Sequence, residues 1–104
     1  MMKKTLTISI ISLSIHFLQG QSGNVGINTT TPVATLDVNG FAADTAKLDG
    51  IIAPRITGNQ LRAKNYTTAQ TGSIVYATLP DTSPAGQTIN VTSAGYYYFD
   101  GTIW

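Results

Sequence analysis

The sequence of 104 residues contains no cysteine and no glutamate, and its single histidine is His16. Without cysteine there are no disulfides, so a chain this small must gain its stability from its own core or from copies of itself. Once the N-terminal segment that holds His16 is removed, neither a Ser-His-Asp triad nor a His-ligated zinc site can form. We therefore expect no enzyme activity, no metal site and no cofactor.

The first residues follow the order of a secretory signal peptide. Two lysines precede the apolar run LTISIISLSIHFL (residues 6–18), and small residues follow it. The run is shorter than the roughly 20 apolar residues of a membrane-spanning helix. A buried helix or an uncleaved anchor is the alternative interpretation. We predict a signal peptide over residues 1–20 with cleavage after Gly20 or Ser22, a secreted chain, and no stable membrane span after cleavage.

Charges after residue 22 are few and mixed. They give a net charge of −1, from Lys47, Arg55, Arg62 and Lys64 against Asp37, Asp44, Asp49, Asp81 and Asp100. Binding to nucleic acid or to anionic membranes requires a basic patch, which is missing here. We therefore expect neither partner. Two aspartates precede glycine and are interpreted as turn residues, Asp49 and Asp100. The stretch DVNG (residues 37–40) lacks the further ligands of a calcium loop.

Residue types and their alternation predict a mainly β chain with many turns. Threonine is frequent and favours strands, whereas glycine and asparagine favour turns. Strands are predicted at residues 24–28, 33–39, 51–56, 72–79 and within 88–99. Residues 42–48 fit either a loop or one or two helical turns. Asn39-Gly40 predicts a tight turn, and Asp100-Gly101 predicts the two-residue turn of a C-terminal hairpin.

One short helix is predicted from about Gly58 to Lys64. Thr57 has the side chain of an N-cap, and Gln60 three residues later completes a capping box. The strand at residues 72–79 is apolar on both faces, which predicts burial on both sides. The residues expected to carry the packing are Leu36, Val38, Ile74, Tyr76, Tyr98 and Trp104.

An aromatic cluster near the C-terminus is the best candidate for a binding site or an interface: Tyr96, Tyr97, Tyr98, Phe99 and Trp104. On a strand, alternate members face opposite sides. One set is expected to pack in the core with Tyr76, while the other stays exposed as a platform for sugar rings or for another chain. Packing within the hairpin and at an interface is the simpler interpretation. A small carbohydrate-binding module is the alternative.

Two stretches resemble a known family. VGINTTTPVATLDVNG (residues 25–40) resembles a motif of bacteriophage tail-fibre proteins and large secreted bacterial surface proteins. The stretch from GIIAPRITGNQLRA through GSIVYAT to GYYYFDGTIW resembles the module that follows this motif in fibre-like bacterial surface proteins. Asn28 stands where the motif usually has glycine, and asparagine tolerates left-handed backbone better than most residues. The resemblance implies a homotrimer in which the strands of three chains share one core.

Taken together, these features predict three parts: a signal peptide at residues 1–20, a fibre-type β motif segment at 21–50, and a small β module at 51–104 with a short helix and a C-terminal hairpin. The predicted function is that of a secreted, non-enzymatic structural or adhesion protein that self-associates and presents a surface for attachment, free or retained at the bacterial outer surface. Its expected partners are copies of itself, and beyond those a cell-surface glycan or a larger fibre protein. A fragment of a larger surface protein is a further alternative.

Overall fold

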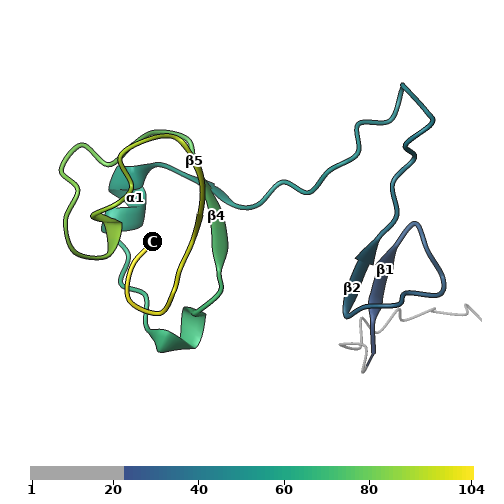
Figure 1. The fold of residues 1–104 in the computed structure, drawn as a ribbon, viewed down its shortest axis with the longest axis horizontal. Helices are drawn as coiled ribbons and strands as arrows, with labels where there is room; N and C mark the ends of the chain where they lie inside the picture. The colour runs from purple at the N-terminus through teal and green to yellow at the C-terminus, as the bar shows by residue number, and fades with distance from the viewer. Residues whose placement is uncertain (1–22) are drawn as a thin grey trace, which may run out of the picture. The chain divides into compact units, whose positions relative to one another are not determined.

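The computed structural model describes residues 23–104, which divide into two compact units, the second comprising Leu48–Trp104 (Figure 1). The predicted signal peptide lies outside the described residues. The elements of the first unit are β1 (Val25–Ile27) and β2 (Leu36–Val38). Those of the second are β3 (Arg55–Ile56), α1 (Gly58–Arg62), the 3-10 helix η1 (Thr68–Gln70), β4 (Ile74–Ala77), the 3-10 helix η2 (Gly86–Thr88) and β5 (Gly95–Tyr98). The prediction of a mainly β chain with one short helix is confirmed.

In the first unit, β1 and β2 form a parallel pair in which Val25 lies beside Leu36 and Ile27 beside Val38. Asn28 follows β1 in a left-handed conformation, with φ at 57°. Its side-chain amide donates a hydrogen bond to the carbonyl of Asn39 at 3.2 Å. The left-handed backbone at this position therefore accommodates asparagine in place of the glycine of the motif.

The tight turn predicted at Asn39-Gly40 does not form. The N–H of Asn39 donates to the carbonyl of Ile27 at 2.9 Å, and its carbonyl accepts from Asn28, so Asn39 is held beside β1 as a continuation of β2. The chain turns later, where the N–H of Asp44 donates to the carbonyl of Phe41 and that of Lys47 to the carbonyl of Asp44. Of the two structures considered for residues 42–48, the loop is observed.

In the second unit, three strands form one sheet in the order β3-β4-β5. β3 runs parallel to β4, and β4 runs antiparallel to β5. Pro54 precedes the edge strand β3, and its carbonyl accepts a hydrogen bond from the N–H of Tyr76 at 2.9 Å. A proline next to an edge strand does not interrupt the hydrogen bonds of the sheet, so this position suits it.

Helix α1 begins at the capping box predicted from the sequence. The Thr57 hydroxyl accepts from the N–H of Gln60 at 3.1 Å, and the Gln60 side chain accepts from the N–H of Thr57 at 3.0 Å. The helix ends at Arg62, two residues earlier than the predicted Lys64. The reciprocal bonds satisfy backbone donors that a helix start would otherwise leave without partners.

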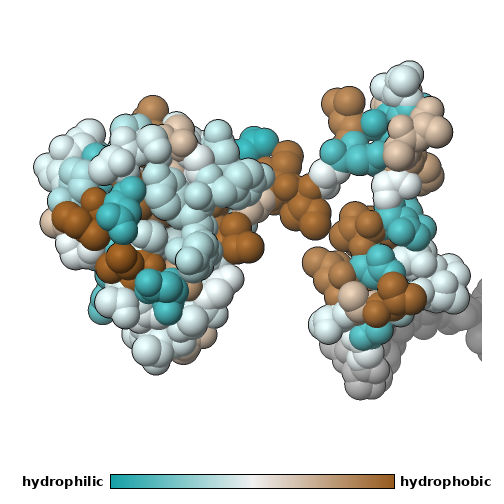
Figure 2. All heavy atoms as spheres, in the orientation of Figure 1, coloured by the Kyte–Doolittle hydropathy of each residue, from teal (hydrophilic) through white to brown (hydrophobic). Residues whose placement is uncertain are grey.

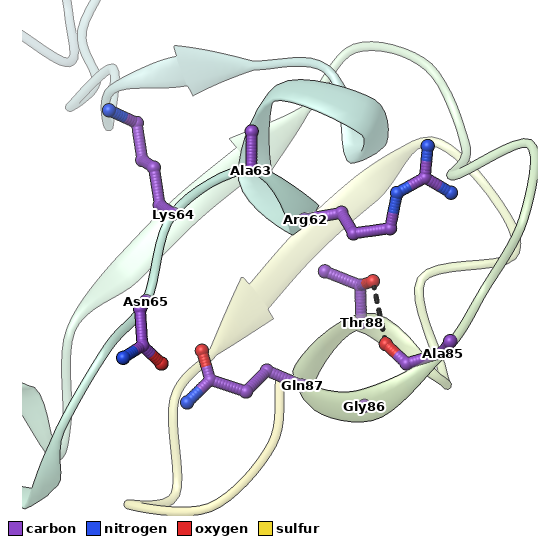
Figure 3. Close-up of a pocket in the computed structure, with 8 residues that line it drawn as sticks. All are labelled: Arg62, Ala63, Lys64, Asn65, Ala85, Gly86, Gln87 and Thr88. Atoms are coloured by element: carbon purple, nitrogen blue, oxygen red, sulfur yellow. Dashed lines mark hydrogen bonds between the residues drawn. The ribbon is translucent and has the colours of Figure 1, made fainter.

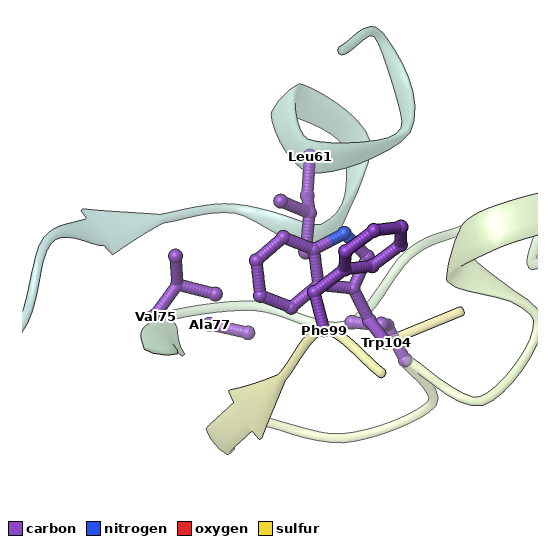
Figure 4. Close-up of a cluster of buried hydrophobic side chains, with 6 residues drawn as sticks. Leu61, Val75, Ala77, Phe99 and Trp104 are labelled. Atoms are coloured by element: carbon purple, nitrogen blue, oxygen red, sulfur yellow. The ribbon is translucent and has the colours of Figure 1, made fainter. Parts of the chain in front are cut away.

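The core of the second unit lies between α1 and the inner face of the sheet (Figure 4). Its buried members are Leu61, Val75, Ala77, Val91, Phe99 and Trp104. Tyr66 packs edge-on against Trp104, with ring centroids 4.8 Å apart. Figure 4 shows Leu61 directed from the helix towards the rings of Phe99 and Trp104. The packing role expected for Trp104 is confirmed, since only 5% of it is exposed.

The expectation that Tyr76 packs in the core is wrong, and the burial expected on both faces of β4 is found on one face within the single chain. Only the face with Val75 and Ala77 is buried, while Ile74 on the other face is 57% exposed. Tyr76 belongs to this outer face, where its ring lies 5.0 Å from that of Tyr96. The reason is that α1 and the residues packed with it cover one side of the sheet only.

The predicted hairpin is only partly present. The turn at Asp100 exists, because the Asp100 carboxylate accepts the N–H groups of Thr102 and Ile103 at 2.8 Å each. These bonds hold the pKa of Asp100 below its ordinary value of 3.8. No strand follows, because the N–H of Trp104 donates to the carbonyl of Gln87 at 2.9 Å and so holds the chain against η2. β5 pairs with β4 instead.

Gly58 leads to a stability prediction at the start of α1. A Cβ built there would collide with the backbone N–H of Asp81 and would lie 2.6 Å from the carbonyl carbon of Pro80. We expect Gly58→Ala to lower the free energy of unfolding by about 1–3 kcal/mol, as overpacking does, although alanine is the better helix former. Chemical denaturation followed by circular dichroism measures this. Unchanged or increased stability would show that the two backbones do not pack this closely.

Candidate assembly surface

The outer face of the second unit's sheet is apolar and open. Ile74 pairs with Tyr98, and Tyr76 with Tyr96, so these four side chains share one face of β4 and β5. Ile74, Tyr96 and Tyr98 are 57%, 62% and 67% exposed. We call these four residues the tyrosine face. An exposed group of large apolar side chains on a small protein is typical of an interaction site.

A shallow hollow of about 530 Å³ extends the tyrosine face. Its lining is Ile51, Ala53, Ile74, Tyr96, Tyr97 and Tyr98. Ile51 and Ile52 are themselves 65% and 70% exposed. Figure 2 shows brown, hydrophobic side chains at the surface of the second unit. The extended run before Pro54 therefore adds apolar area beside the strands, which the sequence interpretation did not assign to a site.

The structure divides the five residues of the aromatic cluster into two groups. Tyr96 and Tyr98 point outward, whereas Phe99 and Trp104 lie in the core of the same chain. Tyr97 is half-buried against that core, and its hydroxyl donates to the carbonyl of Ser93 at 2.7 Å. Two of the five are therefore available for contact with another molecule, while the other three fix the strand from which they project.

A second hollow, of about 340 Å³, lies between α1 and η2 (Figure 3). Three of its polar side chains, those of Arg62, Gln87 and Thr88, have partners within the chain. The Gln87 amide accepts from the N–H of Tyr66 and donates to its carbonyl, at 3.0 and 2.7 Å. The Thr88 hydroxyl bonds Asp81 and the carbonyl of Ala85. These groups hold the loops together and are not directed at a ligand.

Asp81 is the centre of a buried polar network behind this hollow. Its carboxylate accepts from the Arg62 guanidinium at 2.6 Å, from the Thr88 hydroxyl at 2.6 Å and from the N–H of Ser83 at 2.9 Å. Burial raises the pKa of Asp81, but the hydrogen bonds from Thr88 and Ser83 and the charge of Arg62 outweigh it, so the pKa is held below 3.8. The carboxylate thus joins α1 to residues 81–88.

This network predicts an acid-dependent loss of stability. The pKa of Asp81 is lower in the folded chain than its unfolded value of 3.8. The carboxylate therefore contributes its full stabilisation above pH 3.8 and loses it as the pH falls through the lower pKa of the folded chain. Asp100 acts in the same direction. We expect the denaturation midpoint to stay level at neutral pH and to fall in acid. The Asp81→Asn protein should have a lower denaturation midpoint than the wild type at neutral pH, and its midpoint should fall less in acid. An equal fall in both proteins would contradict the stabilising role of the Asp81 carboxylate.

Within residues 23–104, no helix has the length and apolar character needed to cross a membrane. In the same part of the chain, no three His, Asp or Glu side chains gather into a set that holds a metal ion. Asp37, from the stretch considered for calcium, accepts the N–H of Val33 at 3.0 Å. Asp100 likewise bonds backbone N–H groups, as its interpretation as a turn residue predicts.

Comparison with known proteins adds one match. The family model described as the phage tail like trimerisation region matches residues 26–104, which run from the middle of β1 to the last residue of the chain. Neither the curated proteins nor the solved structures gave a match.

Proposed function

Because this chain belongs to the phage tail like trimerisation region family, we propose that it is a secreted structural subunit whose three copies join through the tyrosine face and present a surface for attachment. A structural module that self-associates into a homotrimer of tail-fibre type is what the family match supports. We propose in addition that the tyrosine face is the contact, that the chain is secreted and that the trimer serves in attachment.

The exposure of the tyrosine face is the main support for the proposed contact. Tyr96 and Tyr98 keep about two thirds of their surface exposed although they project from an ordered strand of a sheet. Burying such a side chain contributes roughly 1.5–3 kcal/mol. The other face of the sheet has its cover within the chain, so a second copy is the partner that completes the fold of each protomer.

A carbohydrate platform on the same tyrosines is the alternative. Sugars are bound by aromatic rings combined with polar groups, because each hydroxyl that is removed from water needs a hydrogen-bond partner. Besides Tyr96 and Tyr98, the hollow is lined by Ile51, Ala53 and Ile74, which offer no polar side chain, and by Tyr97, whose hydroxyl already donates to the carbonyl of Ser93. This chemistry suits the apolar face of another chain better than a glycan.

Secretion and attachment rest on the sequence. The order of charge, apolar run and small residues in residues 1–23 supports export, and a trimer of tail-fibre type would work outside the cell. The mass of the exported protein tests this, because cleavage after Gly20 or Ser22 leaves a defined new N-terminus. Recovery of the uncleaved chain inside the cell would contradict the proposed export.

Single introduced cysteines test the proposed contact, because the chain has none of its own. Ile74→Cys places a thiol on the tyrosine face, and Ala63→Cys places one on the exposed helical layer that covers the other side of the sheet. A short trivalent maleimide should convert the Ile74→Cys protein into covalent trimers and leave the Ala63→Cys protein monomeric on a denaturing gel. Equal yields from both variants would contradict the proposed interface.

A further inference from the structure

The first unit carries its own apolar face. The register of β1 and β2 places Val25 beside Leu36 and Ile27 beside Val38, so four aliphatic side chains project from one side of the pair. They are 45%, 56%, 47% and 39% exposed, in that order. We call these four residues the aliphatic face. It contains no charged side chain and no hydrogen-bonding side chain.

The opposite side of the same pair is covered by residues 28–35. Gly26, at the centre of β1, has the Thr29 methyl group and Pro32 so close that a Cβ would lie 2.9 Å from the first and 3.4 Å from the second. Asp37, the register partner of Gly26, accepts the N–H of Val33 at 3.0 Å. The polar contacts of the unit are therefore on this side, and the aliphatic face remains open.

This arrangement cannot be stable by itself. Each strand has three residues, and an isolated two-stranded sheet is at best marginal in water. Parallel strands occur almost only where both of their faces are covered. Here one face has its cover from the connecting residues, and the other exposes four aliphatic side chains. Among the described residues of this unit, none covers the aliphatic face.

We infer that the aliphatic faces of three chains pack against one another, and that β1 and β2 become ordered only when they do. This rests on the proposed trimer and assigns it a second contact, separate in the chain from the tyrosine face. The occupant is a further copy of the same segment. A purely aliphatic surface without charge is complementary to itself, and the trimerisation family match includes Gly26, Ile27 and all of β2.

Threonine substitutions test this inference in the full chain. Ile27→Thr and Val38→Thr keep a β-branched side chain, which favours a strand, and remove apolar surface from the aliphatic face. Val33→Thr is the matched control, because Val33 is 90% exposed in the same unit and lies outside the strands. Trp104 fluorescence reports whether the second unit has stayed folded.

The expected effect is on the trimer dissociation constant, measured by sedimentation over a dilution series. Either threonine substitution should raise the trimer dissociation constant by about a thousandfold. The trimer holds three copies of the substituted side chain, and each copy should cost about tenfold in affinity. Val33→Thr should leave it unchanged. Hydrogen exchange gives a second readout: the N–H groups of Val25 and Asn39, which bond Thr35 and Ile27, should be protected in the trimer and exchange quickly on dilution to monomer.

The outcomes separate this inference from the proposed function. A trimer that Ile27→Thr and Val38→Thr leave intact overturns the inference, while the trimer through the tyrosine face stands. A wild-type monomer at all concentrations overturns both. Protection of Val25 and Asn39 that persists in the diluted monomer also overturns the inference, because the aliphatic face would then be covered by the chain's own residues.

Discussion

Tyr98→Lys is expected to convert the protein from a trimer into a folded monomer. Tyr98 lies on the edge strand β5 and is 67% exposed, so the single chain loses little packing when it is replaced. In the assembly the same position would be buried, and three lysines would be brought together in surroundings from which water is excluded. Burying charge without a partner costs several kcal/mol, and exposed lysine on an edge strand opposes pairing with other chains.

The measurement is sedimentation velocity at several concentrations, with circular dichroism as the test of folding. Ala63→Lys is the control, since it adds the same charge on the helical layer that covers the opposite side of the sheet. It should remain trimeric. A Tyr98→Lys protein that is still a trimer would place the interface elsewhere in the chain.

Phe99→Ala is expected to remove most of the stability of the second unit. Phe99 is fully buried, and its ring lies 5.6 Å from Tyr66 and 5.3 Å from Trp104, measured between centroids. Truncation of a buried phenylalanine costs about 3–5 kcal/mol through lost burial and the cavity that remains. A folded domain has only about 5–15 kcal/mol to lose, so the loss is a large fraction.

Denaturant titration at one fixed protein concentration, followed by Trp104 fluorescence, measures the effect. Ile89→Ala is a suitable control, because Ile89 belongs to the same unit and is 49% exposed, so its truncation should cost much less. The loss of unfolding free energy in Phe99→Leu should lie between those of Phe99→Ala and Ile89→Ala. If Phe99→Ala costs no more than Ile89→Ala, the cluster in Figure 4 is not the core that holds this unit together.

Several features that depend on neighbouring residues were predictable from the sequence, although the tight turn expected at Asn39-Gly40 does not form. The capping box of Thr57 and Gln60 forms as expected, because its hydrogen bonds join residues three apart. The same residue pattern at Thr67 and Gln70 forms a second capping box, which starts η1. The turn at Asp100 formed for the same reason, since its carboxylate reaches the next backbone N–H groups.

Features that depend on distant residues were not predictable. Alternation along β4 showed two apolar faces, but only the position of α1 decides which of them is buried in the chain. Tyr76 was therefore placed in the core when it belongs to the outer face. The Asp81 network joins this carboxylate to Arg62, 19 positions earlier, and to Thr88, 7 positions later, and these members have no sequence pattern in common.

The same distinction applies to the candidate site. The aromatic residues could be found in the sequence, because they are concentrated near one end. Their separation into outward Tyr96 and Tyr98 and buried Phe99 and Trp104 depends on which strand β5 pairs with. Ile51 and Ala53 line the same hollow as the tyrosine face only because the residues before β3 reach the outer side of the sheet.

Light scattering of the purified protein at several concentrations gives its solution mass and so shows whether three chains associate. We expect a mass about three times that of one chain, stable over dilution until the trimer dissociates as a whole. Tyr98→Lys should shift it to the mass of a single chain without loss of secondary structure. A folded wild-type protein with the mass of one chain at every concentration would contradict the proposed trimer.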